Sequence, residues 1–308
     1  MSLAISVMLL CAFIIPRHVK LQRHAVQSET LPVSISRGTP TFTTNFVFGD
    51  DFSIVAVNGP REQPKPLWTD YLAKYYTKTP LHTINLAQAG SAIDHSLINS
   101  TNGTSLQHQI TDFLSSYTNS TNSSALAAQW DPSTTLLTFW FGANDIVLSH
   151  NTSTHRPVDS IMTSYSASLE TLFDAGARNF LFLNVPSVEY IFKTQKYIAD
   201  MQRDVDDFNK KLLTLRLNFM RDHAADITSA LYLDVHELWT QATRHPEEFG
   251  QTRDIKDAVG KCMAHLLDQA SGDEASLVEE SCNRLHDLTA AVMWSDYLEE
   301  GMPSRYCS

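Results

Sequence analysis

The most constraining feature of this sequence is a repeated alternation, from about residue 42 onward, of short apolar runs with longer amphipathic segments. The apolar runs predict buried strands, at residues 45–48, 83–87, 135–141, 179–185 and 231–235. The amphipathic segments predict helices, at residues 67–76, 106–117, 161–173, about 195–226 and 237–248. Strands separated by helices form βαβ units, which build a parallel sheet with helices on both faces. We therefore expect one three-layer α/β/α domain around a parallel five-stranded sheet.

The charge balance of the chain excludes one large class of partners. Its 308 residues include 23 Lys and Arg against 34 Asp and Glu, a net charge of −11. A surface of that sign repels phosphate backbones, so we expect no nucleic-acid partner.

The N-terminal segment has the character of an export signal. Residues 3–15 are a mostly apolar run closed by Pro16, and a bilayer-spanning helix needs about 20 such residues. No basic residue precedes the run and a basic stretch follows it, so a cleaved signal peptide and an uncleaved anchor both stay open. We expect a signal peptide or anchor at residues 1–24, a linker at 25–41 and the folded domain at 42–308.

Sequons agree with export from the cell. Five N-x-S/T sequences predict N-glycosylation, at Asn99, Asn102, Asn119, Asn122 and Asn151. The chain is therefore expected to be a secreted glycoprotein.

The cysteines are expected to form one disulfide. Once Cys11 is set aside with the leader, a Cys262–Cys282 bridge would close a loop of about 20 residues and contribute about 3 kcal/mol, with Cys307 left over. A zinc site built from Cys262, Cys282 and His286 is the rival interpretation, but it lacks the usual closely spaced ligand pairs.

Polar motifs stand where the predicted strands end. Gly49-Asp50-Asp51 follows the first strand, Gly90 follows the second, and Gly142-Ala143-Asn144-Asp145 follows the third. Asp296-Tyr297-Leu298-Glu299 lies near the C-terminus, just after Trp294. Ligands of parallel α/β sheets bind at the carboxyl ends of the strands, so these motifs mark the expected site.

In this order the motifs resemble the four blocks of the SGNH, or GDSL, hydrolases: G-D-S, a glycine, G-x-N-D and D-x-x-H. The resemblance covers about residues 42 to 300, and residues 245–250, followed by two cysteines, are most similar to the fungal acetylesterases of carbohydrate esterase family sixteen. It implies a flavodoxin-like fold and an acetylated carbohydrate or other small ester as the substrate. We expect no cofactor, no metal and a monomeric chain.

The mechanism that this resemblance implies is nucleophilic. A serine attacks the ester carbonyl, a histidine takes its proton, and an aspartate orients the histidine. The serine N–H, a glycine N–H and an asparagine amide hold the oxyanion. Gly90 and Asn144 match the oxyanion-hole positions, and Asp296 matches the orienting acid.

The two reactive positions depart from the family pattern. Asp51 stands where the family has its serine, and Glu299 stands where it has its histidine. Ser53, Ser91 and His286 do not have the positions that would let them substitute. A carboxylate about 4 Å from a developing oxyanion costs about 4 kcal/mol at an effective dielectric near 20, roughly a thousandfold in rate. We therefore expect weak or no serine-esterase activity.

Three interpretations of the site remain open. The chain is an esterase by descent with reduced or absent activity, or a non-catalytic carbohydrate-binding pseudoenzyme, or a protein in which Asp51, Asp296 and Glu299 form a carboxylate-based glycosidase or cation site. Phe139, Trp140 and Phe141 are expected to be strand core and not a sugar platform.

Overall fold

The computed structural model describes residues 41–54, 67–77, 79–98, 104–118, 130–150, 158–187 and 198–244. The expected leader at residues 1–24, the five sequons and the four cysteines lie outside these residues, as do His286, Asp296 and Glu299. The fold described below is that of the central part of the chain.

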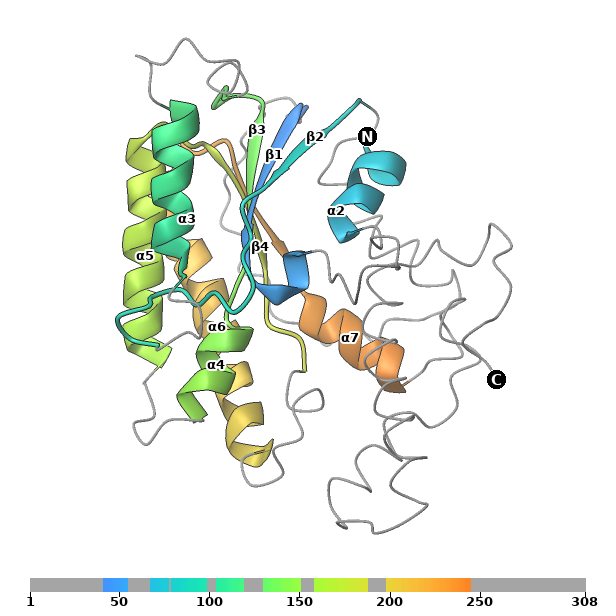
Figure 1. Cartoon of the computed structure of the whole chain (residues 1–308), viewed down its shortest axis with the longest axis vertical. Helices are drawn as coiled ribbons and strands as arrows, with labels where there is room; N and C mark the ends of the chain where they lie inside the picture. The colour runs from blue at the N-terminus through green and yellow to red at the C-terminus, as the bar shows by residue number, and fades with distance from the viewer. Residues whose placement is uncertain are drawn as a thin grey trace, which may run out of the picture.

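A parallel sheet with the strand order β2-β1-β3-β4-β5 lies at the centre of the molecule (Figure 1). Its strands are β1 (Thr44–Gly49), β2 (His82–Asn85), β3 (Thr135–Trp140), β4 (Asn179–Leu183) and β5 (Ser229–Leu233). The first described strand, β1, lies second from one edge of the sheet. β2 is added at that edge, and β3, β4 and β5 follow in order on the other side of β1. The five predicted strands and their parallel pairing are confirmed.

Helices cover both faces of the sheet, as the sequence predicts (Figure 1). On one face lie α3 (Leu106–Phe113), α4 (Ala143–His150), α5 (Val158–Asp174) and α6 (Ile198–Asp222). On the other face lie α2 (Trp68–Tyr71) and α7 (Val235–Arg244). Three short turns of helix complete the set: η1 (Asp51–Ser53), η2 (Leu72–Tyr76) and η3 (Leu114–Thr118). Of these helices, none is long and apolar enough to cross a membrane.

Alternate strand residues build two separate cores, one on each face of the sheet. The larger core contains stacked phenylalanine rings that run from Phe48 of β1 through Phe139 of β3 to Phe182 of β4, with Phe180 stacked on Phe182 in the same strand. The smaller core, on the α2 side, includes Val47, Trp68 and Trp140. Because side chains alternate along a strand, successive strand residues point into different cores, and the polar residues of the site lie beyond the strand ends.

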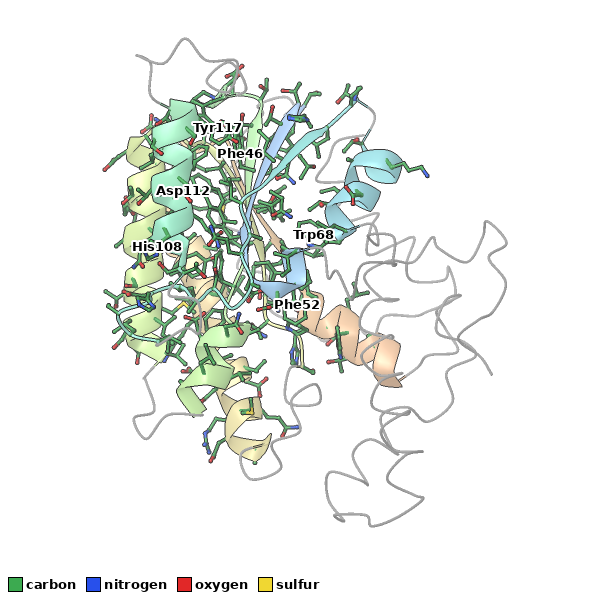
Figure 2. The ribbon with its side chains drawn as sticks, viewed as in Figure 1. Phe46, Phe52, Trp68, His108, Asp112 and Tyr117 are labelled. Carbon is green, nitrogen blue, oxygen red and sulfur yellow. The ribbon has the colours of Figure 1, made fainter. Side chains whose placement is uncertain are left out.

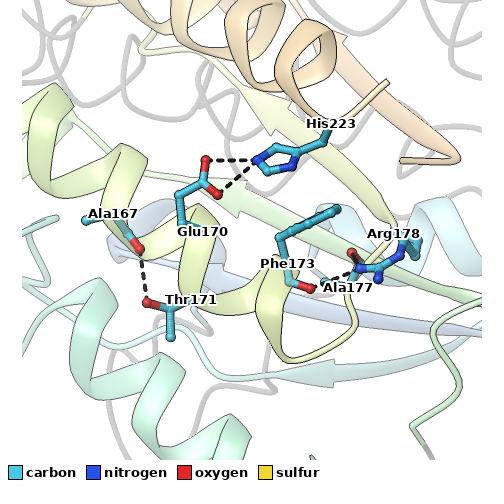
Figure 3. Close-up of polar contacts among 7 residues, drawn as sticks. All are labelled: Ala167, Glu170, Thr171, Phe173, Ala177, Arg178 and His223. Carbon is cyan, nitrogen blue, oxygen red and sulfur yellow. Dashed lines mark hydrogen bonds and ion pairs between the residues drawn. The ribbon is translucent and has the colours of Figure 1, made fainter. Parts of the chain in front are cut away.

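An ion pair joins α5 to the C-terminal end of α6 on the larger-core side. The Nε2 atom of His223 lies 2.9 Å and 3.0 Å from the two carboxylate oxygens of Glu170 (Figure 3). The centroids of the His223 and Phe173 rings are 3.9 Å apart, and the Arg178 guanidinium carbon lies over the Phe173 ring, 4.4 Å from its centroid. This cluster holds the two longest helices together.

The structure corrects several predicted boundaries. The segment 143–150 was not predicted to be helical, yet it forms α4. The predicted strand at 231–235 ends earlier, at Leu233, because the Asp234 carboxylate caps α7 by accepting a hydrogen bond of 2.9 Å from Glu237 N. Val235 is therefore the first residue of a helix and not the last residue of a strand. The predicted helix at 67–76 is a short α-helix followed by a π-helical turn.

Candidate active site

The candidate site lies at the carboxyl ends of three neighbouring strands. β1 ends into η1, which carries Asp51; β2 leads to a loop that carries Gly90; and β3 leads into α4, which carries Asn144. Because these strands are neighbours in the parallel sheet, their ends bring the three residues to the same edge.

The three residues are in direct contact through a single oxygen atom. Oδ2 of Asp51 accepts a hydrogen bond of 2.9 Å from Gly90 N and one of 2.8 Å from Asn144 Nδ2. Asp51 is exposed, whereas Gly90 and Asn144 are half-buried. Hydrogen bonds of this length to an ionised carboxylate are among the stronger ones in proteins. We refer to Gly90 N–H and the Asn144 amide N–H as the donor pair.

Local geometry fixes each member of the donor pair. Gly90 has φ +71°, in the left-handed region that glycine adopts most easily, and this aims its N–H at Asp51. The Asn144 Nδ2 atom donates a second hydrogen bond, of 3.0 Å, to the carbonyl oxygen of Ser91. Both neighbours of this atom are acceptors, so it must be the nitrogen and not the oxygen of the amide. The two donors are therefore oriented by the surrounding backbone.

Gln109 of α3 contacts two backbone segments of the site, a role that was not predicted from the sequence. Its side chain accepts from Gly49 N at 2.9 Å and donates to Gly49 O at 2.8 Å and to Ser91 Oγ at 3.2 Å. It thus ties the end of β1 to the loop that follows Gly90. The signal in the sequence was a glutamine next to Ile110 on the apolar face of the predicted helix, where it is fully buried.

The two serines that the sequence analysis set aside are both buried. Ser53 is fully buried, and its hydroxyl accepts a hydrogen bond of 3.4 Å from Trp68 Nε1. Ser91 Oγ bonds to Thr104 Oγ1 at 2.9 Å as well as to Gln109. Both hydroxyls are thus engaged in hydrogen bonds within the protein.

Two buried carboxyl groups lie beneath the site. Asp50 accepts a hydrogen bond of 3.1 Å from Phe52 N through Oδ1, while its Oδ2 atom is buried and has no hydrogen-bond partner among the described residues. Burial raises the pKa of Asp50 well above its usual range. Burial likewise raises the pKa of Asp145 to about 7, although Asp145 accepts a hydrogen bond of 3.0 Å from Ile93 N.

These two acids have different local roles. Asp145 holds the Ile93 N–H and so fixes the loop that begins at Gly90. Asp50 caps η1, the turn that presents Asp51. Both acids follow predicted strands in the sequence, but no role was predicted for either.

The aromatic residues at the end of β3 belong to the core. Phe139, Trp140 and Phe141 are 0%, 1% and 1% exposed, which confirms the prediction that they are not a sugar platform. Phe52 lies on η1, at the end of β1 (Figure 2). Its half-buried ring stacks on Trp140, with 5.0 Å between ring centroids. Phe52 therefore packs η1, the turn that carries Asp51, against the smaller core.

The C-terminal part of the predicted site is not described. Asp296 and Glu299 lie outside the described residues, so their position relative to Asp51 stays a prediction. Among the residues that the structure describes, no group of three His, Cys, Asp or Glu side chains is arranged to hold a metal ion.

The chain matches the GDSL-like lipase/acylhydrolase family over residues 46–248. It is 29% identical over 188 residues to a thermolabile hemolysin of Vibrio parahaemolyticus serotype O3:K6 (strain RIMD 2210633), covering 60% of this chain and 40% of the hemolysin. It is 23% identical over 192 residues to an acetylesterase of Thermothelomyces thermophilus, covering 59% of this chain and 61% of the acetylesterase. The chain thus spans less than two thirds of the length of either relative.

Among solved structures, a member of the lipolytic protein G-D-S-L family from Veillonella parvula DSM 2008 is similar, with a TM-score of 0.43 and 12% identity. That similarity covers 82% of this chain and 97% of the other.

Proposed function

The chain belongs to the GDSL-like lipase/acylhydrolase family, and on that premise we propose that it is a secreted esterase-like protein whose serine-esterase chemistry has been silenced. In this proposal Gly90 and Asn144 are the retained oxyanion hole, and Asp51 replaces the nucleophilic serine. Asp296 is the retained orienting acid, and Glu299 replaces the catalytic histidine.

One observation carries the proposal: Asp51 Oδ2 accepts hydrogen bonds from both members of the donor pair, at 2.9 Å and 2.8 Å. A carboxylate in this place has no hydroxyl to attack an ester and already fills the position that a substrate oxyanion would take. The sequence alone suggested repulsion between Asp51 and the oxyanion, and direct occupation of the donors is the stronger obstacle because it excludes the substrate oxygen.

We propose an acetylated carbohydrate, or another small ester, as the ligand of the site. The support for this class is the acetylesterase among the relatives, together with the resemblance of the sequence to family-sixteen acetylesterases. Secretion is supported by the apolar run at residues 3–15 and by the five sequons.

Restoring the two replaced residues tests the proposal. The natural chain should hydrolyse an activated acetate ester slowly or not at all, whereas Asp51→Ser combined with Glu299→His should hydrolyse it at least about a hundredfold faster. The measurement is initial rates on the activated ester and then on an acetylated xylo-oligosaccharide, with the full-length secreted protein.

A third variant separates site chemistry from background hydrolysis by surface groups. Adding Asn144→Ala to the restored protein should reduce its rate about a hundredfold, because one oxyanion donor is lost. If the natural chain itself turns over and Asp51→Ala abolishes that turnover, the silenced-esterase proposal is wrong and Asp51 takes part in the chemistry. Binding of unmodified oligosaccharide without turnover would identify the protein as a carbohydrate-binding pseudoenzyme.

A further inference from the structure

We propose that the donor pair is a carboxylate-binding site whose resident ligand is the side chain of Asp51, and that it takes a small free carboxylate such as acetate when that side chain is shortened. The proposal deepens the proposed function because it concerns the same site, but it requires no catalysis. In the natural chain the site would serve the fold, by joining η1, the Gly90 loop and α4.

The geometry of the contact is that of a bound ligand. Two N–H groups from separate parts of the chain converge on one oxygen, Asp51 Oδ2, from residues 39 and 93 positions away. Both distances lie in the range of charge-assisted hydrogen bonds. The carboxylate is exposed, so the place it occupies is open to solvent and a free carboxylate could reach it.

The donor pair does not depend on Asp51 for its arrangement. Asn144 Nδ2 is held by the carbonyl of Ser91, and Ser91 is held in turn by Gln109. The Gly90 N–H is fixed by the left-handed backbone at that residue and by the Ser91 N–H bond to Gln88 O, at 3.2 Å. When the Asp51 side chain is removed, the two N–H groups should therefore keep their positions and lack only their acceptor.

The contact also stabilises the Asp51 carboxylate beside a buried acid. Asp51 lies next to Asp50, a buried acid whose pKa is raised by its burial and, in smaller part, by the charges of Asp51 and Asp145. An unpaired carboxylate at residue 51 would repel any negative charge on Asp50 without compensation. The donor pair supplies that compensation, because both N–H groups present positive partial charge to Oδ2.

Acetate rescue tests the proposal. Asp51→Ala should unfold at a temperature about 6 °C below that of the natural chain, as expected when two net hydrogen-bond contributions are lost from a domain of this size. Sodium acetate should raise the melting temperature of Asp51→Ala in a saturable way, by about 2 °C or more, because it binds the folded state. Sodium chloride at the same ionic strength and pH should not.

Two controls localise the effect. The natural chain should show no saturable acetate shift, because Asp51 already occupies the donors, and Asp51→Ala with Asn144→Ala should show none, because a donor is missing. Asp51→Ser is the second test variant if Asp51→Ala fails to fold. Its side chain is too short to reach both donors, so it should show the same acetate shift.

Two outcomes would overturn the proposal. One is an acetate shift of equal size in all four proteins, which would indicate a general salt effect. The other is a folded Asp51→Ala or Asp51→Ser that acetate does not stabilise. Either result would leave the esterase experiment untouched, since restored hydrolysis by Asp51→Ser with Glu299→His depends on turnover and not on acetate binding.

Discussion

A carboxylate at residue 51 changes what the neighbouring N–H groups do. In an acyl-transfer enzyme such donors stay available for an oxygen that becomes negative only during the reaction. Here the oxygen is part of the chain and is negatively charged in the ground state, so the donors are satisfied before any substrate arrives. The same hydrogen bonds that would lower a transition state therefore contribute to the stability of the folded protein.

The first prediction concerns the hydrogen bond from Asn144 to Asp51. Asn144→Asp replaces the donor to Asp51 with a second carboxylate, so it should lower the free energy of unfolding by about 2 kcal/mol. Asn144→Ala, which removes the donor without adding charge, should cost about 1 kcal/mol. Urea unfolding at neutral pH measures both.

The swapped double variant completes this cycle. Asp51→Asn with Asn144→Asp restores a donor facing an acceptor, so it should recover about half of the loss caused by Asn144→Asp alone. Recovery is incomplete because Ser91 O still lacks its donor. A double variant no more stable than Asn144→Asp alone would mean that the contact between residues 51 and 144 contributes nothing to stability.

The buried carboxyl of Asp145 gives the second prediction, which concerns pH. Its pKa is about 7 in the folded state against 3.8 for an ordinary aspartate, so the folded state binds the extra proton between these two values. Stability should therefore fall as the pH rises from about 4 to about 7, by about 4 kcal/mol. Asp145→Asn keeps an oxygen to accept from Ile93 N and has no proton to lose, so it should remove this part of the pH dependence.

Urea unfolding at stepped pH values between about 4 and 8 measures the effect. Asp50 contributes a slope of the same sign in both proteins. Because the charge of Asp145 also raises the pKa of Asp50, the difference between the two curves reports Asp145 together with its effect on Asp50. Asp145→Ala is the control: it deletes the acceptor of Ile93 N and should be less stable across the whole range. Parallel curves for the natural chain and Asp145→Asn would contradict the prediction.

At the scale of elements, the junction between β3 and α4 decides where Asn144 lies. Two residues, Phe141 and Gly142, separate the two elements, and Gly142 has φ +118°. A Cβ atom at this position would lie 2.5 Å from both Val185 Cγ2 and Phe208 Cζ. Only glycine fits there without strain, so the position of α4 depends on this residue.

Gly142→Ala should therefore destabilise the protein by about 3 kcal/mol, because backbone strain and overpacking add together. Gly176→Ala is a matched control, since Gly176 also has positive φ, +104°, but an added Cβ would meet only Pro132 Cγ, at 3.5 Å. That variant should lose about 1–2 kcal/mol, from backbone strain alone. Equal losses in the two variants, measured by thermal and urea unfolding, would show that packing against Phe208 is unimportant.

The sequence predicted the strands well because each carries β-branched or aromatic residues in a short apolar run, as at Thr135–Trp140. It missed α4 because its eight residues, ANDIVLSH, carry little amphipathic signal and begin directly after a strand. Because Asp51, Gly90 and Asn144 each follow a predicted parallel strand, the sequence also predicts that they lie at the same edge of the sheet. It could not foresee the Asp51 contact, because hydrogen bonds between such distant residues depend on side-chain geometry.

At the scale of the whole molecule, the candidate site and the contact between α5 and α6 lie at opposite edges of the sheet. Asp51 and the donor pair lie at the carboxyl edge of the sheet, while the Glu170–His223 pair joins the far ends of α5 and α6 (Figures 1 and 3). Substitution at the site can therefore alter function without unpacking the phenylalanine core. The fold and the candidate site of this family scaffold therefore depend on different parts of the molecule.

The last prediction concerns glycosylation of the intact chain. Each predicted sequon lies between two described elements and not within one: Asn99 and Asn102 precede α3, Asn119 and Asn122 precede β3, and Asn151 precedes α5. Glycans attached there would not interrupt the hydrogen bonds of a helix or strand. Expressed through a eukaryotic secretory pathway, the protein should migrate as a heavier species that enzymatic removal of N-glycans converts to a single lighter band.

The matched control is the chain in which all five of these asparagines are replaced by glutamine, which should migrate at the lighter position without treatment. Cytosolic expression of residues 42–308 should give the same lighter band, because that compartment does not attach N-glycans. The expected result follows only if the N-terminal apolar run directs the chain into the secretory pathway. A secreted protein that does not change mobility on glycan removal would show that the sequons are chance features of Ser/Thr/Asn-rich connections.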